Sequence, residues 1–179
     1  MSDWNVVVTI ASGRYSQALD LLTPFGQVRR SDFYNVLTLR TEDIPGLLEA
    51  LRQVLAVDPV AAALIGKVIP CPQTFTFNSP QEFMTQAGMI LASLAPALAG
   101  QSFHVRLHRR GFKGRISTPQ TEQALDDLLL AATTGLGRPA QVTFSDPQII
   151  VALETVGTRA GIALWDREQR LKYPFLRLD

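Results

Sequence analysis

The order of strand and helix patterns over residues 5–77 constrains the fold of this chain most strongly. Asn5–Ile10 (NVVVTI) is apolar and β-branched, which predicts a buried strand, and apolar residues at helical spacing follow it as far as Phe25. Gln27–Arg40 (QVRRSDFYNVLTLR) is then typical of a β-hairpin, whose exact register stays open. The first part of the segment therefore predicts a strand, a helix and two strands.

A second helix and a last strand complete the segment. Apolar side chains recur at offsets of three and four between Ile44 and Leu55, and the acids Glu42 and Asp43 precede them, where a helix N-terminus favours negative charge. Val68–Phe77 returns to extended character, with prolines that favour an edge strand or a connection between domains. The whole order, strand, helix, two strands, helix and strand, predicts an N-terminal ferredoxin-like sandwich.

A new helix begins after this segment and marks the predicted domain boundary. Ser79-Pro80-Gln81-Glu82 has the form of a capping box, which places the division between residues 78 and 79 and gives domains 1–78 and 79–179. The second domain is predicted to contain a helix that begins at Pro80 and ends near Gly100, a strand over Phe103–His108, and a helix from Thr118 with Asp126 and Asp127 toward solvent. A short strand Val142–Phe144 and strands Ile149–Val156 and Ala160–Trp165 are predicted to follow. The predicted class is α+β, with an α/β second domain.

Composition excludes several classes of protein. The chain has 179 residues, of which 46% are hydrophobic and 18% charged, so it is expected to bury a globular core. The formal net charge is only +1, so any preference for anions has to come from an uneven distribution of charge. A single cysteine, Cys71, and the lack of a secretory signal pattern favour a cytoplasmic protein. The most apolar long window, Phe83–Ala99, falls short of the roughly 20 apolar residues of a membrane span, so no membrane is expected.

The stretch FHVRLHRRGFKG, residues 103–114, concentrates positive charge. The cations of this region are Arg106, Arg109, Arg110, Lys113 and Arg115. The nearest acids in sequence are Glu82 and Glu122, whereas a surface built only for solubility intersperses the two signs. The pattern therefore indicates an anion-binding surface suited to phosphates, and a solvated basic loop without a ligand is the alternative. Phe112, among the cations, is expected either to stack on a base or to pack on its own domain.

Residues for catalysis or for metal binding do not form a recognisable pattern. His104 and His108 lie four apart on a predicted strand with no carboxylate or thiol nearby, so no metal is expected. Gly135–Arg138 follows a helix, whereas a phosphate-binding glycine loop follows a strand and opens a helix. We therefore expect no cofactor and no enzymatic activity of the chain itself.

Residues 79–168 resemble a THUMP domain. The resemblance rests on the FHVRLHRRGFKG motif between two helices and on the later stretch VTFSDPQIIVALETVGTRAGIAL. The RLHRRG sequence and the D-P-x-x-x-V-x-L-E pattern are most similar to those of THUMP proteins that act as adaptors for tRNA cytidine acetylation. THUMP domains are commonly preceded by a ferredoxin-like domain, which agrees with the order predicted for residues 5–77.

The resemblance implies that the chain binds the acceptor region of tRNA and presents it to a separate RNA-modification enzyme. A cytidine acetyltransferase is one candidate for that enzyme. In THUMP enzymes an attached domain performs the chemistry, and the chain is expected to have no room for one. DNA is not expected as a partner. The expected RNA contacts are Arg106, Arg109, Arg110, Lys113 and Arg115, with His108 and Arg159 as weaker candidates.

Two other functions stay open. The chain can be one subunit or a split half of a tRNA methyltransferase or thiolation enzyme complex, in which case a catalytic partner should co-purify. It can also be a ferredoxin-like module that binds a protein or a small anion and no RNA. Titration with tRNA at two salt concentrations separates this last function from the other two.

Overall fold

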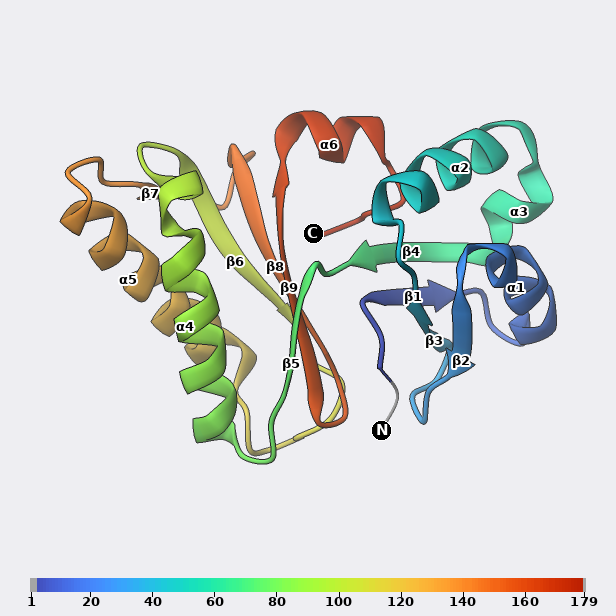
Figure 1. The fold of residues 1–179 in the computed structure, drawn as a ribbon, viewed down its shortest axis with the longest axis horizontal. Coiled ribbons are helices and arrows are strands. Elements are labelled where there is room, and N and C mark those ends of the chain that lie inside the picture. Colours follow the sequence, from blue (N-terminus) through green and yellow to red (C-terminus); the bar gives the residue numbers. More distant parts are fainter. Residues whose placement is uncertain (1–2, 179) are drawn as a thin grey trace. The chain divides into compact units, whose positions relative to one another are not determined.

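The computed structural model describes residues 3–178 of the chain, which forms two compact units. The first unit runs to Pro72 and takes in Lys172–Arg177, and the second comprises Gln73–Leu171 with Leu178. Within the described residues, no helix is long and apolar enough to cross a membrane. The α+β class is confirmed, because each unit combines helices with a sheet of its own (Figure 1).

The first unit is a ferredoxin-like sandwich, as the sequence predicts. Its four strands lie in the order β2-β3-β1-β4, and every neighbouring pair is antiparallel. The elements are β1 (Val6–Ile10), α1 (Tyr15–Leu22), a 3-10 turn (Thr23–Phe25), β2 (Gln27–Arg30), β3 (Val36–Arg40), α2 (Ile44–Val57), α3 (Pro59–Leu64) and β4 (Ile65–Pro70). The helix α3 is additional to the predicted elements.

Local sequence explains where the helices of this unit begin. The carboxylate of Asp43 accepts a hydrogen bond of 2.8 Å from the Gly46 N–H and caps α2. Asp58 performs the same function for α3, since its Oδ1 accepts from the Val60 N–H at 2.8 Å. Pro59 at the first turn of α3 needs no hydrogen bond for its nitrogen, so the Asp-Pro pair is sufficient to start this short helix.

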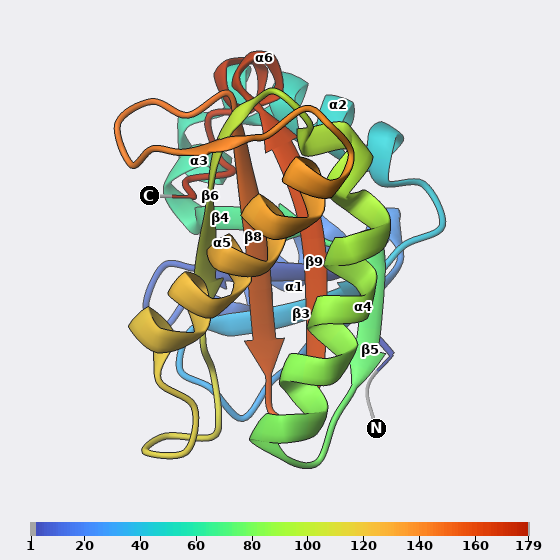
Figure 2. The ribbon, with the colours of Figure 1, turned by 90° about the vertical axis from the view of Figure 1, so that its left-hand side faces the viewer.

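The second unit has a mixed five-stranded sheet with the order β5-β9-β8-β6-β7. The strand β6 is parallel to β7 and β8, and the other pairs are antiparallel. The elements are β5 (Gln73–Thr76), α4 (Pro80–Leu98), β6 (Ser102–His108), α5 (Thr118–Gly135), β7 (Gln141–Val142), β8 (Ile149–Val156), β9 (Arg159–Asp166) and α6 (Arg167–Lys172), whose last residue already belongs to the first unit. The helices α4 and α5 cover one face of the sheet, as Figure 2 shows.

The helix-covered face contains the core of the second unit. Alternate residues of β6, namely Phe103, Val105 and Leu107, are buried there together with Leu91 of α4 and Leu129 of α5.

The start of α4 confirms the predicted cap in part. The Ser79 hydroxyl accepts from the Glu82 N–H at 3.1 Å, whereas the Glu82 carboxylate accepts from the N–H of Asn78 and not from that of Ser79.

The predicted extended segment Val68–Phe77 is two strands that belong to different sheets. The strand β4 pairs with β1 in the first unit, whereas β5 pairs with β9 in the second. The compact units therefore divide between Pro72 and Gln73, while the sequence predicts a division between residues 78 and 79. The boundary differs because β5 is hydrogen-bonded to β9 of the second unit. The two strands lie more than 80 residues apart in sequence, so no local pattern indicates their pairing.

Two carboxylates of α5 close the open edge of β6. The short strand β7 pairs only with Ser102 and Phe103, so further N–H groups along this edge have no strand partner there. Asp126 accepts from the Val105 N–H at 2.9 Å, and Glu122 accepts from the Leu107 N–H at 2.8 Å. The prediction that Asp126 faces solvent is wrong, since its side chain is needed to satisfy this strand edge and the residue is only 6% exposed.

Asp126 makes the stability of the fold depend on pH. Burial raises the pKa of Asp126 to about 6, against a weaker, opposing effect of the Val105 hydrogen bond. The folded state therefore binds this proton more tightly than the unfolded chain does. As a result, the free energy of unfolding falls as the pH rises from 3.8 to about 6, and the whole decrease is present above that range.

Replacing Asp126 by Asn keeps an acceptor oxygen for Val105 and removes the buried charge. We expect D126N to raise the free energy of unfolding at pH 7.5 by about 1–2 kcal/mol and to flatten its pH dependence between pH 4 and 7. Urea denaturation at several pH values measures both effects. Asp127 is the exposed neighbour on the same helix, and D127N should change neither quantity by a comparable amount. A loss of stability in D126N at pH 7.5 would contradict the buried-charge explanation.

Candidate nucleic-acid interface

The predicted cations lie on β6 and on the segment that follows it, residues 109–115, here called the basic loop. Two backbone contacts hold this loop against the end of β8 and the turn to β9. The Arg110 N–H donates to the Thr155 hydroxyl at 2.9 Å, and the Arg110 carbonyl accepts from the Gly157 N–H at 2.9 Å. Gly111 has a φ of +106°, and a Cβ there would lie 3.3 Å from the backbone of Gly157. A glycine is therefore needed for this close approach.

Phe112 anchors the basic loop to its own unit. Its ring lies 5.0 Å from the ring of Phe77, between centroids, and packs against the helix-covered core. Its carbonyl accepts from the N–H groups of Arg115 and Ile116 at 3.0 and 3.1 Å, which closes the loop onto the start of α5. Of the two roles considered for this aromatic residue, the structure supports packing on its own domain.

Lys113 and Arg115 are the exposed cations of the basic loop. The Arg115 guanidinium lies 4.9 Å from the centre of the Phe112 ring, which orients it without neutralising it. Arg115 also borders a groove of about 250 Å³ between the first turns of α4 and α5, where Ser117 and Gln120 contribute polar groups. This end of the second unit therefore presents two unneutralised positive charges beside the first turns of two helices.

Arg110 and His108 are bound to a carboxylate that the local sequence does not contain. Glu154 of β8 lies opposite His108 in the sheet register and is fully buried. Arg110 Nη1 donates to Glu154 Oε2, and His108 Nδ1 lies 3.2 Å from Glu154 Oε1. The expectation of an acid-free cation cluster is thus wrong for these two residues, because strand pairing brings in an acid from about 45 residues along the chain.

The other predicted contacts have different environments. Arg106 is half-buried on the face of β6 opposite the helices. Arg109 donates through Nη1 to the Gly111 carbonyl, which directs its guanidinium along the loop. Arg159, in the second unit on β9, donates to the Thr74 hydroxyl of β5 at 2.7 Å. Arg106, Arg109 and Arg159 are thus all partly buried. Of the seven predicted RNA contacts, Lys113 and Arg115 are the exposed ones.

His104 is a structural residue on β6. It is buried, and its Nδ1 lies 2.9 Å from the Thr143 carbonyl, which fixes the imidazole ring. Burial lowers the pKa of His104, and the Thr143 hydrogen bond opposes this shift. The residue is therefore neutral at pH 7 and adds no positive charge to the surface.

One sequence signal could have revealed Glu154. It is the only charged residue in the strand IIVALETV, and it directly follows the continuous apolar run Ile149–Leu153. A carboxylate in such a strand needs a cationic partner, and the cation-rich neighbouring strand is the obvious source. The signal identifies a buried ion pair but does not say which cation forms it.

Glu154 should stabilise the end of β6 and the basic loop. Arg110 is only 14% exposed in its side chain, so E154Q leaves its guanidinium largely buried without a counter-ion. We expect the free energy of unfolding to fall by about 3 kcal/mol, measured by urea denaturation. Replacing both partners, as in E154Q with R110M, should recover part of that loss. The exposed acid Glu168 provides the matched control E168Q, and an E154Q variant as stable as this control would disprove the role of the pair.

Known proteins resemble this chain in fold. No protein-family model and no curated protein matches its sequence. Three solved structures match 89% of the chain: PH1313 from Pyrococcus horikoshii Ot3, with a TM-score of 0.60 and 13% identity; TrmN from Thermus thermophilus, with 0.55 and 17%; and a 4-thiouridine synthetase in a complex with RNA and ATP, with 0.54 and 11%.

The chain is shorter than each of these proteins. It covers 53% of the PH1313 chain, 44% of TrmN and 40% of the 4-thiouridine synthetase, so it spans about half of their length or less. TM-scores of 0.54–0.60 at identities of 11–17% show a similarity of fold alone.

Proposed function

We propose that this protein is a non-catalytic tRNA-binding protein of the THUMP type that presents the acceptor region of tRNA to a separate RNA-modification enzyme. The observation that carries the proposal is the basic loop, which is held in place at both ends and leaves Lys113 and Arg115 exposed. A preordered loop loses little conformational entropy on binding, so its cations are well suited to phosphate contacts.

Charge distribution supports RNA as the ligand. The chain as a whole carries a net charge of only +1, yet no acid occurs in the sequence between Glu82 and Glu122. Glu154 neutralises part of the positive charge from inside the unit and leaves the exposed side of the basic loop positive. A phosphate backbone is a natural partner for such a surface, since it offers negative charge at regular spacing.

The shared fold also supports this function. One of the similar structures is a 4-thiouridine synthetase bound to RNA, and another is TrmN. Together with the THUMP resemblance of residues 79–168, these similarities favour a role in tRNA modification. The RLHRRG sequence, which is similar to that of THUMP adaptors for tRNA cytidine acetylation, favours a cytidine acetyltransferase as the enzyme that receives the tRNA.

A second function has a specific observation in its favour. The chain covers less than half of TrmN and of the 4-thiouridine synthetase, as expected of an RNA-binding part that works with a catalytic part. The chain would then be a subunit of a methyltransferase or thiolation complex. Purification of the tagged protein from its source separates the two functions, because a stable catalytic subunit would co-purify only in the second.

Replacement of Lys113 and Arg115 tests the RNA surface. We expect K113A with R115A to weaken tRNA binding and to reduce the slope of log affinity against log salt concentration by about 1.5, since two phosphate contacts are lost. Fluorescence titration with total tRNA at three or more salt concentrations measures the slope.

The matched control removes the same charge from another place on the second unit. Arg138 follows α5, and Arg167 follows β9, so both lie away from the basic loop, which precedes the other end of α5. R138A with R167A should leave the salt slope unchanged. Equal effects of the two double variants would mean that net charge, and not the basic loop, governs binding, and the proposed surface would be abandoned.

A further inference from the structure

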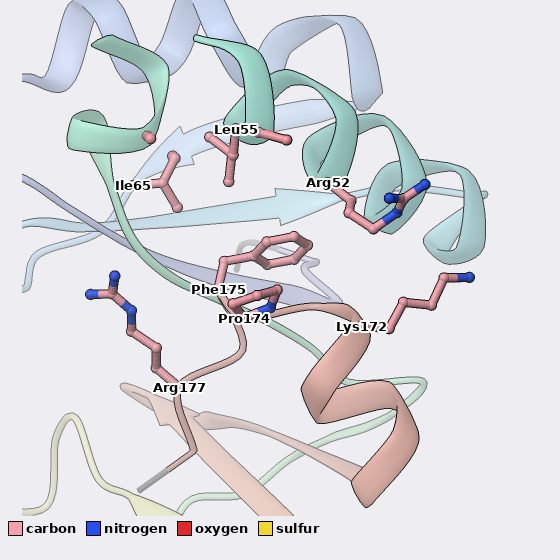
Figure 3. Close-up of a pocket in the computed structure, with 9 residues that line it drawn as sticks. Arg52, Leu55, Ile65, Lys172, Pro174, Phe175 and Arg177 are labelled. Carbon is pink, nitrogen blue, oxygen red and sulfur yellow. The ribbon is translucent and has the colours of Figure 1, made fainter. Parts of the chain in front are cut away.

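The first unit contains a groove that is separate from the basic loop. Its cavity volume is about 310 Å³, and its walls come from α2, α3, the start of β4 and the segment Lys172–Arg177, here called the tail (Figure 3). All of these residues belong to the first unit. The groove is therefore built by segments that lie far apart in sequence and meet in one compact body.

The tail is fixed by specific contacts, so the groove exists before any ligand binds. The Phe175 carbonyl accepts from the Val68 N–H at 2.9 Å, which attaches the tail to β4. The Tyr173 hydroxyl donates to the Glu49 carboxylate of α2 at 2.6 Å. Tyr173, Phe175 and Leu176 are all buried.

The floor of the groove is apolar. Leu55 and Ile65 face Pro174 and Phe175 across it, as Figure 3 shows, and Ala56 and Ala62 complete the lining. Such a surface favours an apolar side chain that leaves water. It offers poor support for a nucleobase, because Phe175 is only 7% exposed and base binding needs an exposed aromatic face.

The rim of the groove is positive. Arg52, Lys172 and Arg177 surround it. Glu49 is the carboxylate beside them, and it binds both Arg52, at 3.0 Å, and Lys172. Counted over these four residues, within the part of the chain that the structure describes, the mouth of the apolar groove carries two net positive charges. An occupant that combines an apolar group with negative charge is complementary to it.

Exposed apolar side chains occur where α2 ends and α3 begins, on the two helices that also contribute Leu55, Ala56 and Ala62 to the groove. Val57 at the end of α2 is 81% exposed and Val60 in α3 is 70% exposed, and Ala63 is exposed beside them. Asp58 between these valines is engaged in capping α3. Exposed apolar side chains at this helix junction favour a protein over a small molecule as the occupant.

We propose that the groove docks an acidic segment of a partner protein, which inserts an aliphatic or aromatic side chain between α2 and the tail and places flanking carboxylates on Arg52, Lys172 and Arg177. The docking surface is independent of RNA binding. Only the identity of the partner, the enzyme that modifies the tRNA, rests on the proposed function.

A peptide selection on the full chain tests this proposal. The probe is a library of random 12-residue peptides displayed on phage, selected on the immobilised protein and then measured as labelled peptides by fluorescence anisotropy. We expect the enriched peptides to combine one or two large apolar residues with flanking Asp or Glu. Enrichment of peptides without acidic residues, or no enrichment over the groove variant described next, would overturn the proposal.

Three variants connect binding to the groove. A56W fills it from an exposed position on α2, so the fold should be retained, and it should abolish peptide binding. K172E with R177E reverses the rim charge and should weaken binding at least tenfold. R29E, on the exposed strand β2 of the same unit, changes charge elsewhere and should leave binding intact.

Nucleic acid is the competing occupant and needs its own measurement. Ten-residue oligouridine should not displace a selected peptide, and A56W should bind tRNA like the unmodified protein. Displacement by oligouridine, with weaker tRNA binding by A56W, would assign the groove to RNA and refute peptide docking. Because K113A with R115A leaves the groove intact, a failure of the RNA surface and a failure of the docking site are observed separately.

Discussion

The contact between Glu154 and the cations at the end of β6 is the interaction on which the candidate interface depends. Glu154 lies near the C-terminal end of β8, and its partners Arg110 and His108 connect the sheet to the basic loop. The same loop is also hydrogen-bonded to Thr155 and Gly157. The buried charge of Glu154 thus helps to fix the positions of the exposed cations of the basic loop. Without this internal counter-ion, the cations of the loop would repel one another.

Sequence periodicity predicts most of the fold and less of the site. The ferredoxin-like order of residues 5–77 and the alternation of Phe103–His108 arise from local patterns, and both are present in the structure. The pairing of β5 with β9 and the roles of Asp126 and Glu154 depend on partners distant in sequence. Periodicity reports which face of an element is buried, whereas it does not report which neighbour satisfies a buried carboxylate or a strand edge.

The two proposed binding surfaces differ in how they combine positive charge with apolar area. At the basic loop, Lys113 and Arg115 offer charge with little apolar area, which suits a polyanion recognised by its backbone. The groove of the first unit combines cations with an apolar floor, which suits a peptide side chain. A nearly neutral protein can therefore present two positive regions with different preferences, because the distribution of charge and apolar area decides each one.

The return of the tail to the first unit has a consequence for biosynthesis. Residues 172–177 complete a body whose other residues precede position 73, so roughly a hundred intervening residues leave the ribosome before that body can close. Until then Leu55 and Ile65 lack the covering provided by Pro174 and Phe175. The tail can therefore pack onto the first unit only after nearly the whole chain has been synthesised, and its long-range contacts raise the contact order of that unit.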